Sequence, residues 1–245
     1  MSFAIFDLDQ TLLPYDTQGL FCNHVLKKHP LRRAYLFLFV PAVLLRALRL
    51  LSTKTLKRLF LSYLRGLRPA EIDALLRSFV EQDVLPALYP DLLAEIARHR
   101  ADGRTLILNS ASPTFCVAAI AARLGFHHAI GTAVQLRDPM PLCPPIPGPN
   151  NKYEAKLQAM RHLLPPNLAL PLPDSWAYSD SRADLPLLRF VEHPVAVHPD
   201  PRLATVATRE HWPVLLPPRP QTSRAAFQRD CFLQALGLFS SPRRP

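Results

Sequence analysis

Three short apolar segments, each ending in a polar side chain, constrain the fold of this chain more than any other feature. They are residues 3–6 before Asp7 and Asp9, residues 105–109 before Ser110, and residues 176–179 before Asp180. Short runs rich in Phe, Ile and Leu are typical of buried strands, and the intervening stretches are long enough for crossover helices. Because the carboxyl ends of parallel strands meet at one edge of a sheet, we expect these polar side chains to converge there.

Helical and extended patterns alternate through the rest of the chain. Helices are expected at 90–100, 113–124, 152–164, 184–191 and 203–210, and strands at 129–136, 194–198 and 213–216. Pro113 at the start of one helix and Gly125 after it are ordinary helix boundaries. The alternation predicts an α/β fold, a Rossmann-like parallel sheet with helices on both faces.

The length of 245 residues suits one α/β domain with an insertion. A hydrophobic content of 49% with 20% charged residues is that of a globular protein. We expect residues 1–13 and 89–216 to form the catalytic core and residues 14–88 to form an inserted helical domain, basic and apolar. Residues 217–245 are expected to be a proline-rich tail with one short helix at 223–238.

The cysteines and the N-terminus indicate the compartment. The four cysteines lie far apart, without the paired spacing of a zinc site or a redox couple, and we expect reduced thiols. Asp7 and Asp9 interrupt the first apolar run too early for a signal peptide. We therefore expect a cytoplasmic protein.

The formal net charge of +10 comes from the insertion. Residues 17–68 contain eleven Lys or Arg and no Asp or Glu, whereas the remainder of the chain is close to neutral. A local excess of this kind favours an anionic partner at that segment. Leu, Val and Phe separate these basic residues, without exposed stacking aromatics, so no nucleic acid is expected.

Residues 34–51 leave three interpretations open: a packed cap helix, a helix on a membrane surface, or a membrane span. The apolar run ends at Arg46 and is shorter than the ~20 residues that a span requires. A single span would also separate Asp7 from Ser110, on opposite sides of the bilayer. Together with a basic amphipathic helix at 54–67, the pattern favours contact with an anionic membrane surface through residues 17–68, on its cytoplasmic face.

Four motifs in order carry a resemblance to a known family. They are Asp7-Leu-Asp9-Gln-Thr11, Ser110-Ala-Ser112, Lys152, and Ser179-Asp180-Ser181-Arg-Ala-Asp184. The set resembles the motifs of the haloacid dehalogenase (HAD) superfamily and covers residues 1 to about 215. The fourth motif and the place of the insertion resemble the phosphoserine-phosphatase-like branch, subfamily IB. The resemblance implies a HAD core with an inserted helical cap.

The resemblance also implies catalytic roles. Asp7 is expected to attack phosphorus and form an aspartyl-phosphate, while Asp9 protonates the leaving oxygen and later activates water. Ser110 and Lys152 are expected to hold the phosphoryl oxygens, with Ser112 in support. Dehalogenases of the superfamily lack the second carboxylate, so Asp9 indicates phosphate chemistry.

A magnesium site follows from the same resemblance. Mg²⁺ prefers hard oxygen ligands, and the expected ligands are the Asp7 carboxylate, the Asp9 backbone carbonyl and Asp180. Asp184 is expected to orient the metal shell, and Thr11 belongs to the supporting set.

Two positions leave alternatives, and a third departs from the family pattern. Lys156, one helical turn after Lys152, is a rival for the phosphate-binding lysine, and Lys152 is preferred. Asp16 stands where phosphoserine phosphatases carry a substrate-binding Glu, and capping the next helix is an equal interpretation. Gln10 replaces the usual Gly of the first motif, with little effect expected.

The predicted activity is Mg²⁺-dependent hydrolysis of a phosphomonoester through an aspartyl-phosphate. The first motif, the apolar basic insertion and the Tyr178-Ser-Asp-Ser stretch together resemble phosphatidylglycerophosphatase C. This resemblance makes a lipid phosphate such as phosphatidylglycerophosphate the first candidate substrate. The alternatives are a soluble phosphorylated metabolite such as phosphoserine, a phosphotransferase with the same intermediate, and a catalytically weak protein that binds membrane surfaces.

Overall fold

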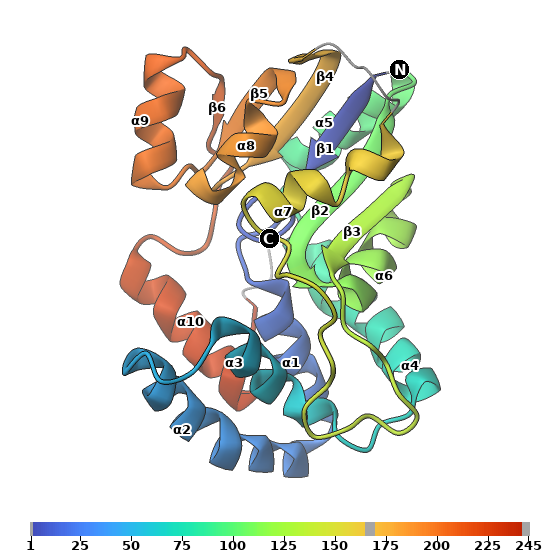
Figure 1. The fold of residues 1–245 in the computed structure, drawn as a ribbon, viewed down its shortest axis with the longest axis vertical. Helices are drawn as coiled ribbons and strands as arrows, with labels where there is room; N and C mark the ends of the chain where they lie inside the picture. The colour runs from blue at the N-terminus through green and yellow to red at the C-terminus, as the bar shows by residue number, and fades with distance from the viewer. Residues whose placement is uncertain (1, 165–169, 242–245) are drawn as a thin grey trace.

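The structure, a computed structural model, describes residues 2–164 and 170–241. Within these residues a six-stranded parallel sheet has the order β3-β2-β1-β4-β5-β6, with helices on both faces (Figure 1). The strands are β1 (Phe3–Phe6), β2 (Thr105–Pro113), β3 (His128–Thr132), β4 (Leu172–Ser179), β5 (Val191–Val197) and β6 (Val214–Leu215). The predicted α/β fold with a Rossmann-like parallel sheet is confirmed.

Strand β1 lies in the middle of the sheet, between β2 and β4. The next strands along the chain, β2 and β3, lie on one side of β1, whereas β4, β5 and β6 lie on the other. Open α/β sheets bind their ligands outside the carboxyl ends of the strands where the strand order reverses in this way. The backbone N–H of Asp7 donates to the carbonyl of Tyr178 at 3.0 Å, so the loop after β1 starts in register with β4.

The alternation of side chains along β1 explains why helices cover both faces. Phe3 and Ile5 belong to one buried cluster, with residues of α8 and α9, whereas Ala4 and Phe6 belong to the other, with residues of α5 and α6. The helices are α1 (Thr17–Lys28), α2 (Leu36–Ala47), α3 (Thr53–Phe60), α4 (Pro69–Phe79), α5 (Pro90–Ala101), α6 (Thr114–Leu124), α7 (Glu154–Gln158), α8 (Leu185–Leu188), α9 (Pro201–Arg209) and α10 (Arg224–Leu236).

The boundaries of helix α6 agree with the prediction, whereas those of helix α7 differ from it. Helix α6 starts directly after Pro113 and ends at Gly125, which adopts a left-handed conformation with φ of 70°. The helix predicted over 152–164 is shorter, because α7 begins at Glu154 and ends at Gln158. Tyr153 before it has φ of 54°, outside the helical region, and this break changes which lysine faces inward.

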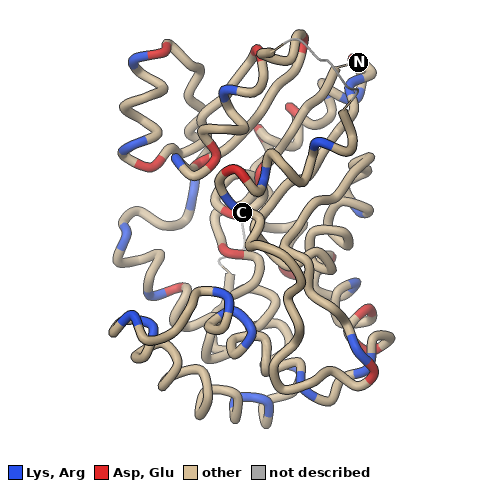
Figure 2. Tube along the Cα trace, viewed as in Figure 1, with Lys and Arg blue, Asp and Glu red and all other residues tan. Residues whose placement is uncertain are grey.

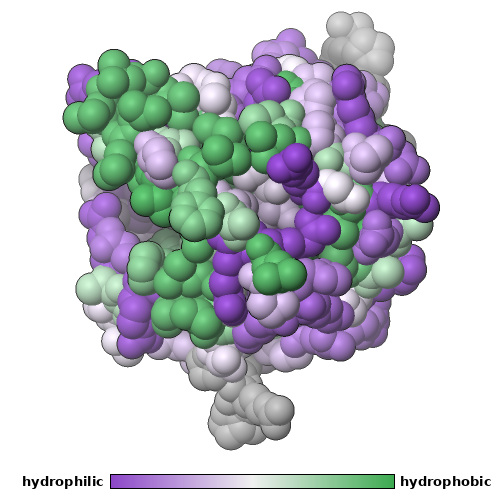
Figure 3. All heavy atoms as spheres, turned by 90° about the horizontal axis from the view of Figure 1, so that it is seen from below, coloured by the Kyte–Doolittle hydropathy of each residue, from purple (hydrophilic) through white to green (hydrophobic). Residues whose placement is uncertain are grey.

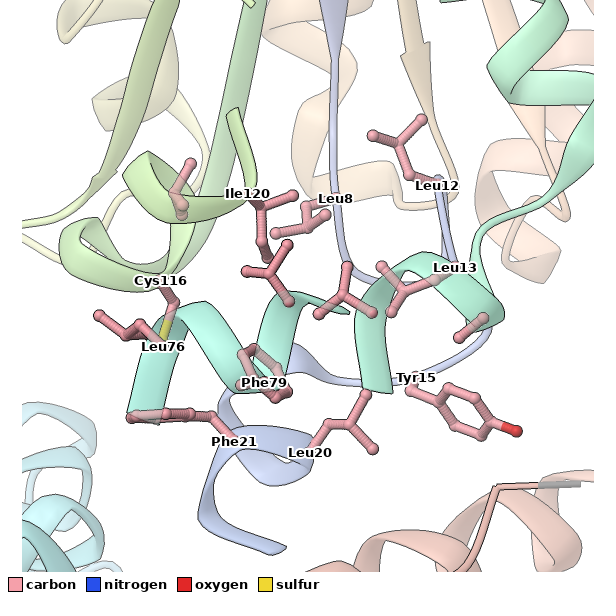
Figure 4. Packing of buried hydrophobic residues seen from close by; sticks show 14 of the residues in the cluster. Leu8, Leu12, Leu13, Tyr15, Leu20, Phe21, Leu76, Phe79, Cys116 and Ile120 are labelled. Carbon is pink, nitrogen blue, oxygen red and sulfur yellow. The ribbon is translucent and has the colours of Figure 1, made fainter. Parts of the chain in front are cut away.

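The insertion packs onto the core through one continuous hydrophobic cluster. Leu8 from the loop after β1, Phe21 from α1, Phe79 from α4 and Ile120 from α6 all belong to it (Figure 4). The rings of Phe21 and Phe79 lie 5.1 Å apart between centroids. The proposed cap therefore shares its hydrophobic core with the catalytic domain.

The predicted C-terminal helix is present as α10, and it packs against α1 beside the insertion (Figure 1). Arg33 donates to the carbonyl of Leu236 at 2.8 Å, and the Tyr35 hydroxyl donates to the carbonyl of Ala235 at 2.7 Å. These bonds use carbonyls at the end of α10 that have no partner inside the helix. We therefore group α10 with the insertion rather than with a separate tail.

Candidate active site

A buried lysine between two aspartates forms the centre of the site at the carboxyl edge of the sheet. The Nζ of Lys156 donates to Asp7 Oδ1 at 2.7 Å and to Asp184 Oδ2 at 2.6 Å. All three residues are at most 7% exposed. The Ser179 hydroxyl donates to the same Asp184 oxygen at 2.6 Å. Burial disfavours the ammonium, but Asp184 and Asp7 outweigh it and raise the pKa of Lys156 above its usual value.

Two carboxylates share one hydroxyl beside this lysine. Thr11 Oγ1 lies 3.3 Å from Asp7 Oδ2 and 3.4 Å from Asp180 Oδ1, and it accepts the backbone N–H of Asp180 at 3.1 Å. Burial raises the pKa of Asp7 to about 6; Lys156 opposes the rise, and Asp184 and Asp9 add to it. Burial and repulsion from Asp7 and Asp184 also raise the pKa of Asp180 well above its usual value. One lysine therefore does not balance the negative charge around Asp7.

Asp9 is held by four donors from two directions. Its Oδ1 accepts the backbone N–H and the hydroxyl of Thr17, both at 2.6 Å. Its Oδ2 accepts from Ser110 at 3.0 Å and from Ser112 at 2.7 Å. Ser110 and Ser112 thus lie at the predicted edge and contact Asp9, and the contact of Ser110 with a phosphoryl oxygen stays a prediction. Nothing in the sequence singled out Thr17, which starts α1.

The structure brings Lys156, rather than the preferred Lys152, into contact with Asp7. Lys152 is exposed and precedes the helical break, whereas Lys156 lies on the first turn of α7, is buried and contacts Asp7. The sequence showed both lysines one turn apart. The start of α7 decides which of the two faces the sheet, and the phosphate-binding role of either lysine stays a prediction.

Two buried asparagines that sequence reasoning missed hold α7 against β2. Asn109 Nδ2 donates to the carbonyl of Lys156 at 3.0 Å. Asn151 Nδ2 donates to Asn109 Oδ1 and to the Ser110 carbonyl, both at 2.8 Å. Each precedes a motif residue by one position, which is the signal that was available. These bonds fix the height of Lys156 above the sheet.

The structure also shows the surroundings of Asp16 and the backbone conformation of Gln10. Asp16 caps α1, since its carboxylate accepts the N–H of Gly19 at 2.9 Å, and it also lines the cavity described below. Gln10 adopts φ of 63°, a left-handed conformation that glycine takes without steric cost. This conformation explains why the family usually has glycine at this turn. With Gln10 in its place, the backbone is strained.

Comparison with known proteins decides the family. Residues 4–189 match the model of the haloacid dehalogenase-like hydrolases. The chain belongs to this family. The predicted family and its enzyme class, hydrolase, are thereby confirmed.

Named relatives of this HAD hydrolase include phosphatases. A probable phosphatase of Mycobacterium tuberculosis (strain ATCC 25618 / H37Rv) is 30% identical over 241 residues, covering 90% of this chain and 77% of that protein. A histidinol-phosphatase of Neisseria meningitidis serogroup C is 26% identical over 221 residues, covering 87% of this chain and 98% of that protein.

Solved structures share the fold. A protein of unknown function from Bordetella pertussis Tohama I superposes with a TM-score of 0.72 at 27% identity, over 88% of this chain and 98% of that one. A probable phosphoserine phosphatase from Vibrio cholerae superposes with a TM-score of 0.63 at 15% identity, over 98% of this chain and 67% of that one. The likeness to both structures agrees with the predicted α/β fold.

The residues at the edge of the sheet fit a divalent cation. Among the described residues, no three His, Cys, Asp or Glu side chains form a metal cluster by themselves. The predicted set needs only two carboxylates, Asp7 and Asp180, and the backbone carbonyl of Asp9. Asp7 and Asp180 point at one hydroxyl and repel each other, which is the electrostatic situation that a bound Mg²⁺ relieves.

The candidate site residues of the HAD hydrolase line a cavity of about 900 Å³. Polar residues line its inner end: Asp7, Asp9, Asp16, Lys57, Lys152, Lys156, Asp180 and Asp184. Its outer walls are apolar and come from α2, α3 and α10, including Phe39, Val43, Leu44, Leu56, Phe227 and Phe232. The cavity therefore has a charged end and a larger apolar end, the shape of a site for an amphiphilic molecule.

Proposed function

We propose that this HAD hydrolase is a Mg²⁺-dependent phosphomonoester phosphatase that works through an aspartyl-phosphate on Asp7. The observation that supports it most directly is Asp7 at the end of the central strand, with its Oδ1 held by a buried lysine. A second carboxylate, Asp9, stands two residues on, oriented by hydroxyl and amide donors. Positioning and charge neutralisation are what phosphoryl transfer requires.

The proposed reaction has two displacement steps. A carboxylate oxygen of Asp7 attacks phosphorus, the bond from phosphorus to the ester oxygen breaks, and Asp9 gives its proton to that oxygen. Asp9 then takes a proton from water, whose oxygen attacks the aspartyl-phosphate and releases phosphate and free Asp7. Lys156, in place of Lys152, holds Asp7 and neutralises phosphoryl charge, and Ser110 contacts a phosphoryl oxygen.

The proposed metal ligands are the Asp7 carboxylate, the Asp9 carbonyl and Asp180, with Thr11 bonded to both carboxylates. When bound, Mg²⁺ supplies positive charge that stabilises the phosphoryl oxygens. Asp184 holds Lys156 and accepts from Ser179, so its proposed role is to position that lysine.

The first experiment separates the nucleophile from the acid. Wild type, Asp7→Asn and Asp9→Asn are mixed with a ³²P-labelled phosphomonoester and quenched in acid. Wild type and Asp9→Asn should retain label on the protein, whereas Asp7→Asn should retain none and lose on the order of 10³-fold or more in turnover. Asp91→Asn, on the exposed first turn of α5, serves as the control. Label on Asp7→Asn would refute the nucleophile.

Dependence on the leaving group tests Asp9 as the acid. An alkyl phosphate needs protonation of its leaving oxygen far more than p-nitrophenyl phosphate does. Asp9→Asn should therefore lose much more turnover on the alkyl ester than on the nitrophenyl ester. Equal losses on both would contradict the role.

We further propose that the substrate is a lipid phosphate, such as phosphatidylglycerophosphate, which the enzyme hydrolyses at an anionic membrane surface. The apolar walls of the cavity support it, since a small polar metabolite would leave Phe39, Val43, Leu44 and Phe232 in contact with water. The charged end accommodates the phosphate, and the apolar end accommodates a hydrocarbon group.

A soluble metabolite is the second candidate, because polar groups also reach the cavity. Asp16 lines it, and Lys57 enters from α3, donating to the Ala111 carbonyl at 2.6 Å and to Asn150 Oδ1 at 3.0 Å. Such groups suit the amine or carboxylate of a metabolite like phosphoserine or histidinol phosphate. A panel with phosphoserine, histidinol phosphate, alkyl phosphates of increasing chain length and phosphatidylglycerophosphate separates the candidates. Rising kcat/KM with chain length supports the lipid substrate, and preference for phosphoserine refutes it.

A further inference from the structure

Helix α2 has apolar side chains on every side, yet little of the protein covers it. Of its residues only Ala42 is buried. We call the exposed apolar side chains outside the cavity the α2 face: Phe37, Leu38 and Leu45 of the helix, and Leu48 and Leu50 of the turn after it. Phe37 is 85% exposed, Leu48 68% and Leu50 71%. Figure 3 shows hydrophobic residues gathered on this end of the molecule. A helix that is apolar all round is normally buried in a core or in lipid.

The mouth of the catalytic cavity is rimmed by the same kind of side chain. Val40, Val43 and Leu44 of α2 and Phe232 of α10 line the cavity and are each at least 41% exposed. Whatever covers the α2 face therefore also meets the entrance to the active site.

The charges around the α2 face indicate what kind of partner covers it. Arg46 lies in the last turn of α2, and Arg49 is exposed in the turn that follows it (Figure 2). No carboxylate occurs between residues 17 and 68 to neutralise them. Arg32, Arg33 and Lys54 are different, since they bind backbone carbonyls within the protein. An apolar surface with exposed cations at one end matches a lipid surface with anionic headgroups.

From these contacts we propose that the α2 face docks on an anionic phospholipid membrane, with the cavity mouth against the bilayer. The apolar part of the substrate then passes from lipid to the space between α2 and α10 without crossing water. The inference rests on the proposed lipid phosphatase function and adds the surface and the orientation. Among the described residues no helix is long and apolar enough to cross a bilayer, and the twelve residues of α2 span about 18 Å. The docked helix therefore lies in the interface.

The test measures vesicle binding and catalysis separately. Co-sedimentation compares phosphatidylcholine vesicles with vesicles that also contain phosphatidylglycerol. The variants are Phe37→Asp with Leu48→Asp, and Arg46→Gln with Arg49→Asn, since Asn tolerates the positive φ of 62° at Arg49. The matched control is Leu216→Asp. Leu216 is 67% exposed, close to the value for Leu48, but it follows strand β6 of the α/β domain and is not part of the α2 face. Hydrolysis of p-nitrophenyl phosphate shows that each variant is folded and active.

Wild type and Leu216→Asp should bind the anionic vesicles, and added salt should weaken this binding. The apolar double variant should lose at least about tenfold in vesicle affinity, and the charge variant should lose its preference for anionic vesicles. All should hydrolyse p-nitrophenyl phosphate equally. Wild type that hydrolyses this ester but does not bind vesicles would overturn the docking and leave the phosphatase intact.

Two other results would overturn the docking surface. Equal vesicle binding by wild type and the apolar double variant would place the contact elsewhere. Dimerisation of wild type that the double variant abolishes, without vesicle binding, would assign the α2 face to a second copy of the chain. If wild type does not hydrolyse the ester at all, the proposed function is contradicted instead. Vesicle binding can still be measured in that case.

Discussion

The carboxyl edge of the sheet and the α2 face are opposite kinds of surface. At the edge, polar groups are buried and bonded to one another: Asp9 accepts from four donors, and Lys156 binds two carboxylates. On the α2 face, apolar groups are exposed, and Phe37 and Leu50 lie largely in solvent. The chain itself holds the proposed reacting groups in place, whereas the proposed cover of α2 is a partner outside the chain.

The two regions also differ in how they respond to change. A buried, bonded charge loses several kcal/mol of interactions when its partner is removed, on the order of 3–5 kcal/mol for a buried ion pair. An exposed leucine can be replaced with little effect on folding. Substitutions at the edge should therefore change stability and chemistry together, and substitutions on the α2 face should change partner binding alone.

The largest effect is expected from the two rival lysines. Lys156→Met should lower kcat/KM by on the order of 10³-fold and lower the free energy of unfolding, because Asp7 and Asp184 lose their shared cation. Lys152→Met, at an exposed position in the same cavity, should lower kcat/KM by less than about tenfold. Steady-state kinetics and thermal unfolding check both, and a greater loss in the Lys152 variant would reverse the assignment.

Removal of one proposed metal ligand should abolish the stabilisation of the protein by Mg²⁺. Mg²⁺ at a hundred times its Kd should raise the free energy of unfolding of wild type by about 2.7 kcal/mol. Asp180→Asn should abolish that gain and, in EDTA, should be more stable than wild type, because it removes a carboxyl that burial and Asp7 disfavour. Thermal shift with and without Mg²⁺ is the measurement. An unchanged Mg²⁺ response in the variant would remove Asp180 from the ligand set.

A smaller effect is expected where the two regions meet. Leu44 lines the cavity, and Leu48, one helical turn on, does not; both are exposed, at 63% and 68%. Leu44→Asn should raise KM for a long-chain alkyl phosphate about fivefold, since roughly 1 kcal/mol of apolar contact is lost. Leu48→Asn should leave that KM unchanged, and neither should affect p-nitrophenyl phosphate. If both variants raise the KM equally, the apolar wall does not contact the substrate.

The smallest effect is expected at Gln10. Gln10→Gly should raise the free energy of unfolding by about 1 kcal/mol or less, because the left-handed backbone costs roughly 1–2 kcal/mol and the greater freedom of unfolded glycine offsets part of it. Gln10→Ala keeps the strained backbone and should show no such gain. Denaturant unfolding distinguishes the two, and an equal gain in both would attribute the cost to the side chain instead.

Much of the catalytic edge was predictable because its signals are local. Asp7, Ser110 and Asp180 each follow an apolar run, and strands of a parallel sheet bring such ends together whatever the intervening sequence. The start of α6 after Pro113 and its end at Gly125 were equally local. By contrast, the bonds of Asn109 to the Lys156 carbonyl and of Thr17 to Asp9 depend on how separate segments pack together. The place of Asn109 next to a motif residue marks it without showing its partner.

The sequence by itself determined the parallel sheet, the order of its motif residues and the apolar, basic character of the insertion. Only the tertiary structure decided that Lys156 and not Lys152 contacts Asp7, that α10 closes one wall of the cavity, and that α2 remains uncovered. The physical reason is range. Strand periodicity and helix boundaries depend on neighbouring residues, whereas the direction of a side chain and the cover of a helix depend on what packs against it from distant parts of the chain.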